Sequence, residues 1–397
     1  MSAFRSFPLS VRLLLVNQFG VNTGFYLLVP YLATHLAGTL GLSAAVVGIV
    51  LGVRTLSQQG LFLIGGTASD RLGPRRVIIA GCALRTVGFG LFALGESVPV
   101  LLAAAVLSGV AGALFNPAVR AYVAVAATEE RRAEAFALFN VFAQAGALVG
   151  PLLGGVLLLW DFRIAAVSAA VVFAVLTVAQ AFALPAREAA EPTGTVLGDW
   201  RECLANRRFL AFTIALTGLY TLQNQLYLVL PMEAMRVTGF AGSVAALFIV
   251  STVVSLVFQV RITRALRDRP RGRSIAVGMA VMGAGFLAPA LSHLWPALGV
   301  PAVLVATLGL AVGVMIAHPF VYELIPSFGR EGLAGTYFGM FYLASGVVAA
   351  AANGVIGWAT EAGGAWGAAV SAAVGLASAG AVLALHRRGA LTMEAAR

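Results

Sequence analysis

Long apolar stretches constrain this chain more than any other feature of its sequence. A helix needs about 20 mainly apolar residues to cross the hydrocarbon core of a bilayer. Twelve such stretches, separated by short polar breaks, lie approximately at 11–36, 43–68, 76–95, 98–124, 135–159, 164–184, 209–232, 243–263, 274–292, 298–319, 332–358 and 365–386. Because 60% of the residues are hydrophobic and only 11% are charged, a water-soluble fold could not bury this much apolar surface. The sequence therefore predicts an all-α membrane protein with twelve transmembrane helices.

The arginines predict the orientation of these helices. With an internal N-terminus, 21 of the 26 basic residues fall in the segments on the inner side. Cytoplasmic loops carry an excess of Lys and Arg, so we expect both termini in the cytoplasm. The net charge of +10 then reflects topology rather than nucleic-acid binding. All basic residues are Arg, and Ala and Gly are abundant. Both features are typical of a GC-rich genome, so we expect the protein to lie in the inner membrane of a bacterium.

The chain also repeats itself. Residues 25–30 (FYLLVP) recur as 226–231 (LYLVLP) at an offset of 201, and 116–117 (NP) match 318–319 (HP) at an offset of 202. Nearly equal offsets, in order along the chain, indicate that spans 7–12 are a parallel duplication of spans 1–6.

The duplication predicts three parts of the chain. Residues 1–184 form an N-terminal six-helix bundle and 209–397 a C-terminal one. Residues 185–208 form a cytoplasmic linker with a short amphipathic helix around 198–206. Parallel halves of this kind are similar to the major facilitator superfamily, in which two halves rock about a midplane cavity. That resemblance implies solute transport.

A glycine-framed, charged loop follows predicted span 2. Its sequence over 66–76, GTASDRLGPRR, resembles the superfamily's motif G-x-x-x-D-R-x-G-x-R-R. The defining positions are Gly66, Asp70, Arg71, Gly73, Arg75 and Arg76. Gly66 allows close helix contact and Gly73 supplies a turn. The resemblance implies that Asp70 faces the N-terminus of span 11, near Gly332, where a carboxylate contributes roughly 0.3–2 kcal/mol and gates access. Alternatively, these charges merely satisfy topology.

The second half keeps the charges of this loop without its glycine frame. The residues at the matching place are Arg264, Arg267, Asp268, Arg271 and Arg273. We therefore expect a gate in the first half only.

Predicted span 5 carries glycines at four-residue spacing around a proline. The residues are Gly146, Gly150, Pro151, Gly154 and Gly155. They predict a flat face for close packing and a bend at the proline. In this span the pattern resembles the antiporter motif of the twelve-helix drug:proton antiporters. The resemblance implies that the motif seals the interface between the halves and that the protein is an exporter.

Further segments are similar to the MdtH-type branch of that family. They are 52–60 (GVRTLSQQG), 114–117 (LFNP) and 161–163 (DFR). One departure is Ala105, where the family usually has an Arg four residues before the glycine, here Gly109. The resemblance implies a secondary transporter that exports drugs or other hydrophobic small molecules in exchange for protons by alternating access.

Two arginines and two polar stripes lie within predicted spans. Arg54 and Arg85 fall near the midplane, where an ionisable group faces a cavity or a partner. Matched stripes on spans 1 and 7, with aromatic residues around them, are expected to line the central substrate cavity. The predicted lining residues are Gln18, Asn22, Tyr26, Arg54, Phe115, Asn116, Tyr220, Gln223, Asn224, Tyr227 and Phe341. Structural packing is the alternative for the arginines and for much of the aromatic set.

Acidic residues do not lie clearly within a span core, so the coupling group is harder to identify. A carboxylate or a His can exchange protons near neutral pH. The candidates are Glu233 and His318, with His35 a weaker one. Arg54 and Arg85 without core acids suggest a rival function, the transport of organic anions or other small metabolites. A non-transporting receptor or scaffold is a second rival.

The sequence predicts no enzyme, metal site or cofactor. An intramembrane enzyme needs a nucleophile with its base, a cluster of His, Asp and Glu, or a metal motif. The four His are scattered, and Cys82 and Cys203 have no metal-ligand spacing. The expected partners are a small-molecule substrate, protons and membrane lipid, and the protein is expected to be a monomer.

Overall fold

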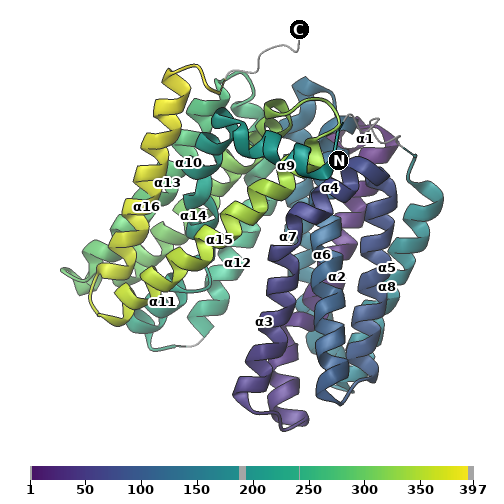
Figure 1. The fold of residues 1–397 in the computed structure, drawn as a ribbon. Helices are drawn as coiled ribbons and strands as arrows, with labels where there is room; N and C mark the ends of the chain where they lie inside the picture. Colours follow the sequence, from purple (N-terminus) through teal and green to yellow (C-terminus); the bar gives the residue numbers. More distant parts are fainter. Residues whose placement is uncertain (1, 187–193, 241, 392–397) are drawn as a thin grey trace. The chain divides into compact units, whose positions relative to one another are not determined.

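The computed structural model describes residues 2–186, 194–240 and 242–391, and all regular structure in these residues is helical (Figure 1). The remaining parts of the predicted linker and of the C-terminal bundle, 187–193, 241 and 392–397, lie outside the described residues. Contacts divide the chain into two compact units. Unit 1 comprises Met1–Cys203 and Gly329–Leu343, and unit 2 comprises Leu204–Phe328 and Ala344–Arg397.

The first unit contains the helices that correspond to predicted spans 1–6. They are α1 (Ser2–Arg5), α2 (Leu9–Thr34) with its π-helical continuation η1 (His35–Thr39), α3 (Ala44–Gly60), α4 (Phe62–Leu72), α5 (Pro74–Leu94), α6 (Val98–Ala126), η2 (Glu129–Arg131), α7 (Arg132–Leu157) and α8 (Phe162–Ala183). The short helix α9 (Val196–Ala205) follows, at the place where the sequence predicts a linker helix.

The second unit contains the helices that correspond to spans 7–12. They are α10 (Arg207–Asn224), α11 (Val229–Thr238), α12 (Gly242–Ala265), α13 (Arg271–Ser292), η3 (Pro296–Leu298), α14 (Gly299–Leu324), η4 (Ile325–Phe328), α15 (Ala334–Glu361) and α16 (Trp366–Arg387). The first residues of α15, up to Leu343, belong to unit 1, and the remainder belongs to unit 2.

Two of the twelve predicted spans are interrupted. Span 2 breaks at Leu61, where α3 and α4 meet at a bend of 45°. Span 7 is divided between α10 and α11. Ten described helices are long and apolar enough to cross a membrane, or eleven with the bent pair, and α10 is not among them. Arg207 and Arg208 at its start and Gln223 and Asn224 at its end lower its mean hydropathy.

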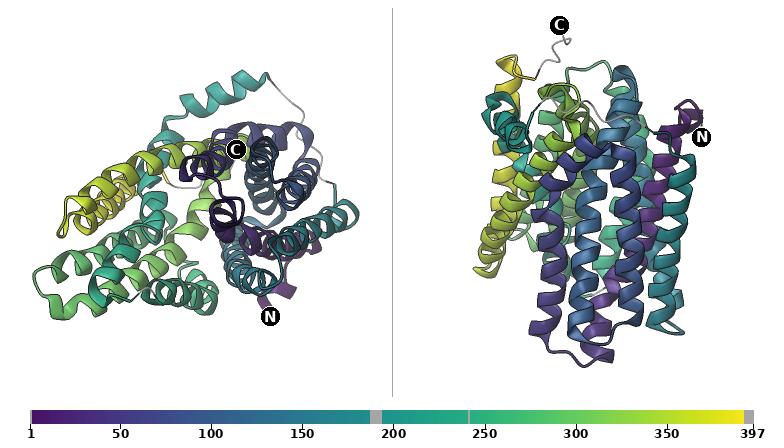
Figure 2. Two further views of the ribbon diagram at one scale, coloured as in Figure 1. Left: turned by 90° about the horizontal axis from the view of Figure 1, so that it is seen from below. Right: turned by 45° about the vertical axis from the view of Figure 1, so that its right-hand side comes forward.

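The two units share one pattern of helix packing. In unit 1, α5 packs on α6 and α8, α3 packs on α6, and α2 packs on α8, as the helices drawn side by side in Figure 2 illustrate. In unit 2, α13 packs on α14 and α16, α12 packs on α14, and α10 packs on α16. Each of these pairs occupies the same position in its half of the chain, as a parallel duplication requires.

Local sequence explains where several helices begin. The side chains of Ser43 and Asp161 accept hydrogen bonds from backbone N–H groups at the starts of α3 and α8. Asn206 does the same for α10. Such caps satisfy N–H groups that have no partner within the helix. Pro74 begins α5, a position that costs proline no hydrogen bond.

Candidate functional site

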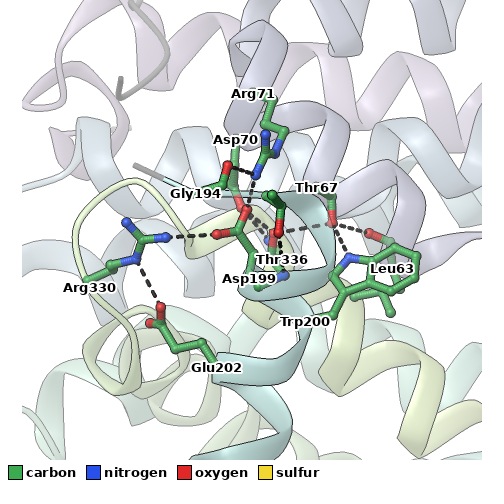
Figure 3. Close-up of polar contacts among 12 residues, drawn as sticks. Leu63, Thr67, Asp70, Arg71, Gly194, Asp199, Trp200, Glu202, Arg330 and Thr336 are labelled. Atoms are coloured by element: carbon green, nitrogen blue, oxygen red, sulfur yellow. Dashed lines mark hydrogen bonds and ion pairs between the residues drawn. The ribbon is translucent and has the colours of Figure 1, made fainter. Parts of the chain in front are cut away.

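The end of α4 contacts the beginning of α15 through one carboxylate. Asp70 Oδ1 accepts a hydrogen bond from the backbone N–H of Gly335 at 2.7 Å, and Oδ2 accepts from the backbone N–H of Thr336 at 2.6 Å. The Thr336 hydroxyl donates to Oδ2 at 2.7 Å. The first N–H groups of a helix lack partners and together carry about half a positive charge. Asp70 therefore caps α15 with a negative charge (Figure 3).

Glycines permit this close approach. A Cβ on Gly66 would fall on the backbone carbonyl of Gly335, and a Cβ on Gly335 would fall on the carbonyl of Gly66. Gly73, between α4 and α5, has a φ of +86°, which side chains with a Cβ rarely allow. The glycine frame of the loop thus brings the backbones of α4 and α15 together and ends α4 just after Asp70.

The three arginines of the loop differ in their surroundings. Arg71 donates to Asp199 Oδ2 at 2.6 Å. Arg75 donates to the backbone carbonyl of Ala181 on α8. Arg76 is exposed. Only Arg71 therefore forms an ion pair within the described residues of this loop.

Asp199 on α9 joins two arginines from distant parts of the sequence. Besides Arg71, it accepts a hydrogen bond from Arg330 Nη2 at 2.7 Å through Oδ1 (Figure 3). Arg330 Nε also donates to Glu202 Oε2 at 3.0 Å. The Asp199 side chain is only 5% exposed. The short helix α9 is therefore tied both to the end of α4 and to the segment that precedes α15.

Trp200 and Cys203 provide further contacts of α9. The Trp200 indole donates to the Thr67 hydroxyl at 2.8 Å, and Thr67 also contacts the hydroxyl of Thr336. The Cys203 thiol is fully buried. Burial, followed by the negative charges of Glu202 and Asp70, raises the pKa of this thiol to about 12. The α9 helix thus contacts the same Asp70 and Thr336 cluster.

The glycine face of α7 packs directly on α2. The glycines are Gly146, Gly150, Gly154 and Gly155. A Cβ on any of the first three would lie within contact distance of the α2 backbone, for example against the carbonyl of Leu27. The Tyr31 hydroxyl of α2 donates to the carbonyl of Pro151 at 2.7 Å. These contacts bind two helices of the first six-helix half to each other.

The polar stripe of α2 also contacts α7. Gln18 Nε2 donates to Asn22 Oδ1 at 2.9 Å, and Asn22 Nδ2 donates to the carbonyl of Ala143 at 2.8 Å. Tyr26 follows one turn later and is half-buried, with its ring 5.2 Å from that of Phe25. The three predicted cavity residues of this stripe therefore lie together, and their role in substrate binding stays a prediction.

Arg54 and Arg85 carry charges that no described carboxylate neutralises. Arg54 is half-buried and lies 5.2 Å from the ring centre of Phe25. Arg85 is 5% exposed and lies 4.9 Å from the ring of Phe115 and 5.7 Å from that of Phe173. A centrally placed Arg in a spanning helix costs about 2.5–3.5 kcal/mol or more. Because each cation–π contact returns about 0.5–2 kcal/mol, these rings offset that cost only in part for Arg54.

Two predicted cavity residues of unit 1, Phe115 and Asn116, contact Arg85 and Arg120, and a third, Phe341, is also buried. Phe115, under Arg85, is fully buried, and so is Phe341. The carbonyl of Asn116 accepts a hydrogen bond from Arg120 Nη1 at 3.1 Å. Both buried rings pack in the interior of the described residues, as in the packing alternative.

In unit 2, predicted cavity and coupling residues come together. Gln223 Nε2 lies 2.9 Å from His318 Nε2, and the hydroxyls of Tyr220 and Tyr322 are 2.9 Å apart. The ring centres of His318 and Tyr322 are 4.8 Å apart. This cluster joins α10 to α14 within the membrane-spanning part of unit 2.

Other predicted residues lie apart from this cluster. Asn224 is the last residue of α10, and the exposed Tyr227 packs on Phe248 of α12. His35 stacks on Phe162 at 3.6 Å between ring centres. The structure therefore brings Tyr220, Gln223 and His318 together, but Asn224 and Tyr227 lie outside this cluster.

Glu233 belongs to a buried ionic cluster near the end of α13. Arg236 donates to Glu233 Oε2 through Nε at 2.9 Å and through Nη2 at 2.7 Å. His293 Nε2 lies 3.1 Å from Glu233 Oε1, and the Ser292 hydroxyl accepts from Arg236 at 3.0 Å. The Glu233 side chain is 6% exposed. Arg236 and His293 thus contact different oxygens of one carboxylate.

Several residues of these clusters escaped the sequence analysis. They are Asp199, Glu202, Arg330, Thr336, His293 and Tyr322. The spacing of Asp199 and Glu202, three apart in a predicted amphipathic helix, was an available signal because it places both on one helix face. His293 and Arg330 meet their partners only through tertiary packing.

The fold and the loop define a transporter of a known class. Residues 14–353 match the Major Facilitator Superfamily, so the chain belongs to this superfamily of membrane transporters, which are not enzymes and bind small-molecule substrates. The sequence prediction of family and fold class is thereby confirmed. The chain is a multi-pass membrane transporter, and its relatives below are bacterial.

Two bacterial proteins are among those similar to this chain. The chain is 45% identical over 364 residues to an uncharacterized MFS-type transporter of Mycobacterium tuberculosis, covering 89% of this chain and 86% of the relative. It is 31% identical over 275 residues to multidrug resistance protein MdtH of Salmonella typhi, covering 69% and 68%.

Solved structures share the fold. The fucose:proton symporter FucP of E. coli has a TM-score of 0.78 at 14% identity, covering 94% of this chain and 97% of the symporter chain. The human organic anion transporter MFSD10 has a TM-score of 0.74 at 17% identity, covering 94% and 99%. At these identities the likeness is one of fold alone.

Proposed function

We propose that the protein exports drugs or other hydrophobic small molecules in exchange for protons by alternating access. The observation that carries this proposal is the contact of Asp70 with the backbone N–H groups of Gly335 and Thr336. A gate must be stable in one state and able to open in another. A carboxylate on a helix N-terminus meets both needs. Its contribution of about 0.3–2 kcal/mol stabilises one state but is small enough for the free energy of ligand binding to overcome. We call Asp70, Gly335 and Thr336 the α15 latch.

The direction of transport is supported by two observations. The glycine spacing of α7 resembles the antiporter motif, which accompanies export in its family, and these glycines pack on α2 within the first half rather than between the halves. The MdtH relative is named a multidrug resistance protein. Apolar surface binds varied ligands because the hydrophobic effect is non-directional. Export of amphipathic molecules follows from these features taken together.

For proton coupling, the cluster of His318 is the better candidate of the two. Protonation of Glu233 would break its two-pronged bond with Arg236. By contrast, His318 faces the neutral Gln223 amide and the two tyrosines. A proton gained at its ring changes the hydrogen bond between α10 and α14, and a His exchanges protons near neutral pH. His318 therefore couples protons to movements of these helices.

The orientation is proposed from the arginines. The end of α4, the α9 helix and the start of α15 would then lie at the cytoplasmic face of a bacterial inner membrane, with both termini on the same side. The α15 latch would be the inner gate, and the protein would act as a monomer.

Transport by purified protein in liposomes tests the proposal. An imposed pH gradient should drive movement of a lipophilic compound such as tetraphenylphosphonium, and His318→Asn should abolish the dependence on pH while retaining binding. Absence of proton-driven movement across a broad panel of compounds would favour the receptor or scaffold alternative. Movement that ignores the gradient would contradict proton coupling but keep transport.

A further inference from the structure

Among the described residues, Arg54 and Arg85 of unit 1 have no carboxylate within ion-pair distance, and no backbone carbonyl accepts from either guanidinium. Within the described residues, Arg236, Arg271 and Arg330 pair with carboxylates in ion pairs of 3.0 Å or less. Arg54 donates only to the neutral Gln58 and Thr55, at 3.3 and 3.4 Å. The Arg85 Nη1 atom is buried and has no hydrogen-bond partner. A buried guanidinium that lacks both a counter-ion and a full set of acceptors is a donor for an anion.

An aromatic cluster connects the two arginines. Arg54 lies over Phe25, whose ring centre is 6.4 Å from that of Phe89. Phe89 lies 4.8 Å from Phe173, and the Arg85 guanidinium lies 5.7 Å from the Phe173 ring. The two positive charges therefore flank one group of phenylalanines contributed by α2, α5 and α8.

The accessible end of this cluster lies on α2 and α3. Arg54, Phe25 and Tyr26 are half-buried, whereas Arg85 and Phe89 are buried. A ligand can therefore reach the Arg54 guanidinium and the Phe25 ring. The buried Arg85 does not contact this ligand but attracts it by the electric field of its positive charge. The backbone of Arg54 is fixed, because Gly109 of α6 packs directly against the Arg54 carbonyl.

We propose that Arg54 and the ring of Phe25 bind amphipathic aromatic anions, with the carboxylate or sulfonate of the ligand on the guanidinium and its ring on Phe25. Arg85 supplies a second positive charge behind the cluster. This inference rests on the proposed function and adds to its substrates molecules that pair an aromatic body with an acidic group. Guanidinium and carboxylate match each other in geometry, which makes an acid the fitting ligand.

A pair of probes that differ only in charge tests the site. Binding of 1-naphthoate and of its neutral analogue 1-naphthamide is measured by calorimetry on the purified full chain, without any proton gradient. Wild-type protein should bind 1-naphthoate about tenfold to a hundredfold more tightly, as a charge-assisted hydrogen bond implies. Arg54→Gln should remove this preference and leave 1-naphthamide binding unchanged, and Arg54→Lys should restore part of it.

Arg120→Gln is the matched control. Arg120 also lies in a spanning helix of unit 1 and over aromatic rings, those of Phe139 and Tyr342, but it donates to the carbonyl of Asn116. This variant should keep the preference for 1-naphthoate. Phe25→Leu should weaken both probes alike. Melting temperatures of all variants exclude loss through unfolding.

Three outcomes overturn the proposal. They are equal or undetectable affinity of wild-type protein for the two probes, a preference retained in Arg54→Gln, and a preference lost equally in Arg120→Gln. The proposed function fails separately. Proton-driven export of tetraphenylphosphonium without a preference for 1-naphthoate would contradict the anion site alone. Selective binding of 1-naphthoate through Arg54 without proton-driven transport would support the site and contradict the coupled exporter.

Discussion

The loop after α4 and its counterpart before α13 occupy matching places in the two halves but use their charges differently. In unit 1, Asp70 contacts backbone N–H groups of α15 that a movement of the helix can release. In unit 2, Arg271 holds Glu323 of α14 through two hydrogen bonds of 3.1 and 3.0 Å. The Glu323 side chain is fully buried. One loop therefore contacts the N-terminus of a helix, and the other forms an ion pair with a buried carboxylate.

The glycines account for the difference. Gly66 and Gly73 allow the backbone of α4 to touch that of α15 and to turn directly afterwards. In the second loop, Arg264 and Arg271 stand at the positions that correspond to Gly66 and Gly73. The contact with the neighbouring helix is therefore made by a long arginine side chain and not by the backbone. The duplicated loop has thus kept its charges in both copies and the contact with a helix N-terminus, our proposed gate, in only one.

Breaking the buried ion pair between Arg271 and Glu323 should have the largest effect on stability. Glu323→Gln leaves the Arg271 guanidinium without its counter-ion, and breaking a buried pair of this kind costs about 3–5 kcal/mol. We expect a clearly lowered melting temperature of the purified protein. The double variant Arg271→Met with Glu323→Met should recover most of the loss. An unchanged melting temperature in Glu323→Gln would show that the pair is not structural.

Releasing the α15 latch should have a smaller effect on stability and a larger one on transport. Asp70→Asn removes the charge while it keeps one acceptor oxygen. The closed form should lose about 1–2 kcal/mol, a roughly five- to thirtyfold change in the ratio of closed to open protein. We expect reduced export in liposomes with a nearly unchanged melting temperature. Full export by this variant would contradict the latch.

The link through α9 should be weaker still, and Cys203 reports on it. The buried thiol has its pKa raised to about 12, so its reactive thiolate is scarce and alkylation by iodoacetamide at pH 8 should be slow. Asp199→Asn breaks the bonds to Arg71 and Arg330, and we expect faster alkylation of Cys203. Cys82 in α5, also buried, should remain unreactive in both proteins. Equal Cys203 rates would show that Asp199 does not hold α9 in place.

The smallest effect is expected from the acid of the second loop. Asp268 is 88% exposed and pairs with Arg267 at 3.5 Å, and surface pairs of this kind contribute little. Asp268→Asn should leave both melting temperature and export unchanged. It is the matched control for Asp70→Asn, because both substitutions remove one carboxylate from corresponding loops. Loss of export in this variant would mean that net loop charge, rather than the latch, is what matters.

Periodic features of the sequence could be predicted well. The twelve apolar stretches, the glycine frame and Asp70 depend on local spacing, and the structure places the Asp70 carboxylate on residues 335 and 336, close to the expected Gly332. The stripes of α2 and α10 were likewise visible from the spacing of Gln18 and Gln223. Local patterns reveal what depends on neighbouring turns of one helix.

Contacts between distant segments could not be predicted in the same way. Arg330 meets Asp199, and His293 meets Glu233, only because separate helices pack side by side. For a polar residue just outside a span, the periodicity of the sequence does not indicate which residue it contacts. The break of span 2 at Leu61 was also missed, although Gly60, the last residue of α3, was an available signal because glycines favour kinks. Arg54 and Arg85 suggested anions from the sequence alone, but the contact of Arg54 with Phe25 became known only from the structure.

The distance between the end of α4 and the start of α15 tests the latch most directly. Spin labels on Leu72→Cys and Glu331→Cys, both at exposed positions of unit 1, are measured by pulsed electron resonance after both native cysteines are replaced by Ser. The account predicts two distance populations whose ratio changes with substrate and pH, and a shift toward the longer distance in Asp70→Asn. One fixed distance, identical with and without substrate at every pH and in both proteins, would contradict it.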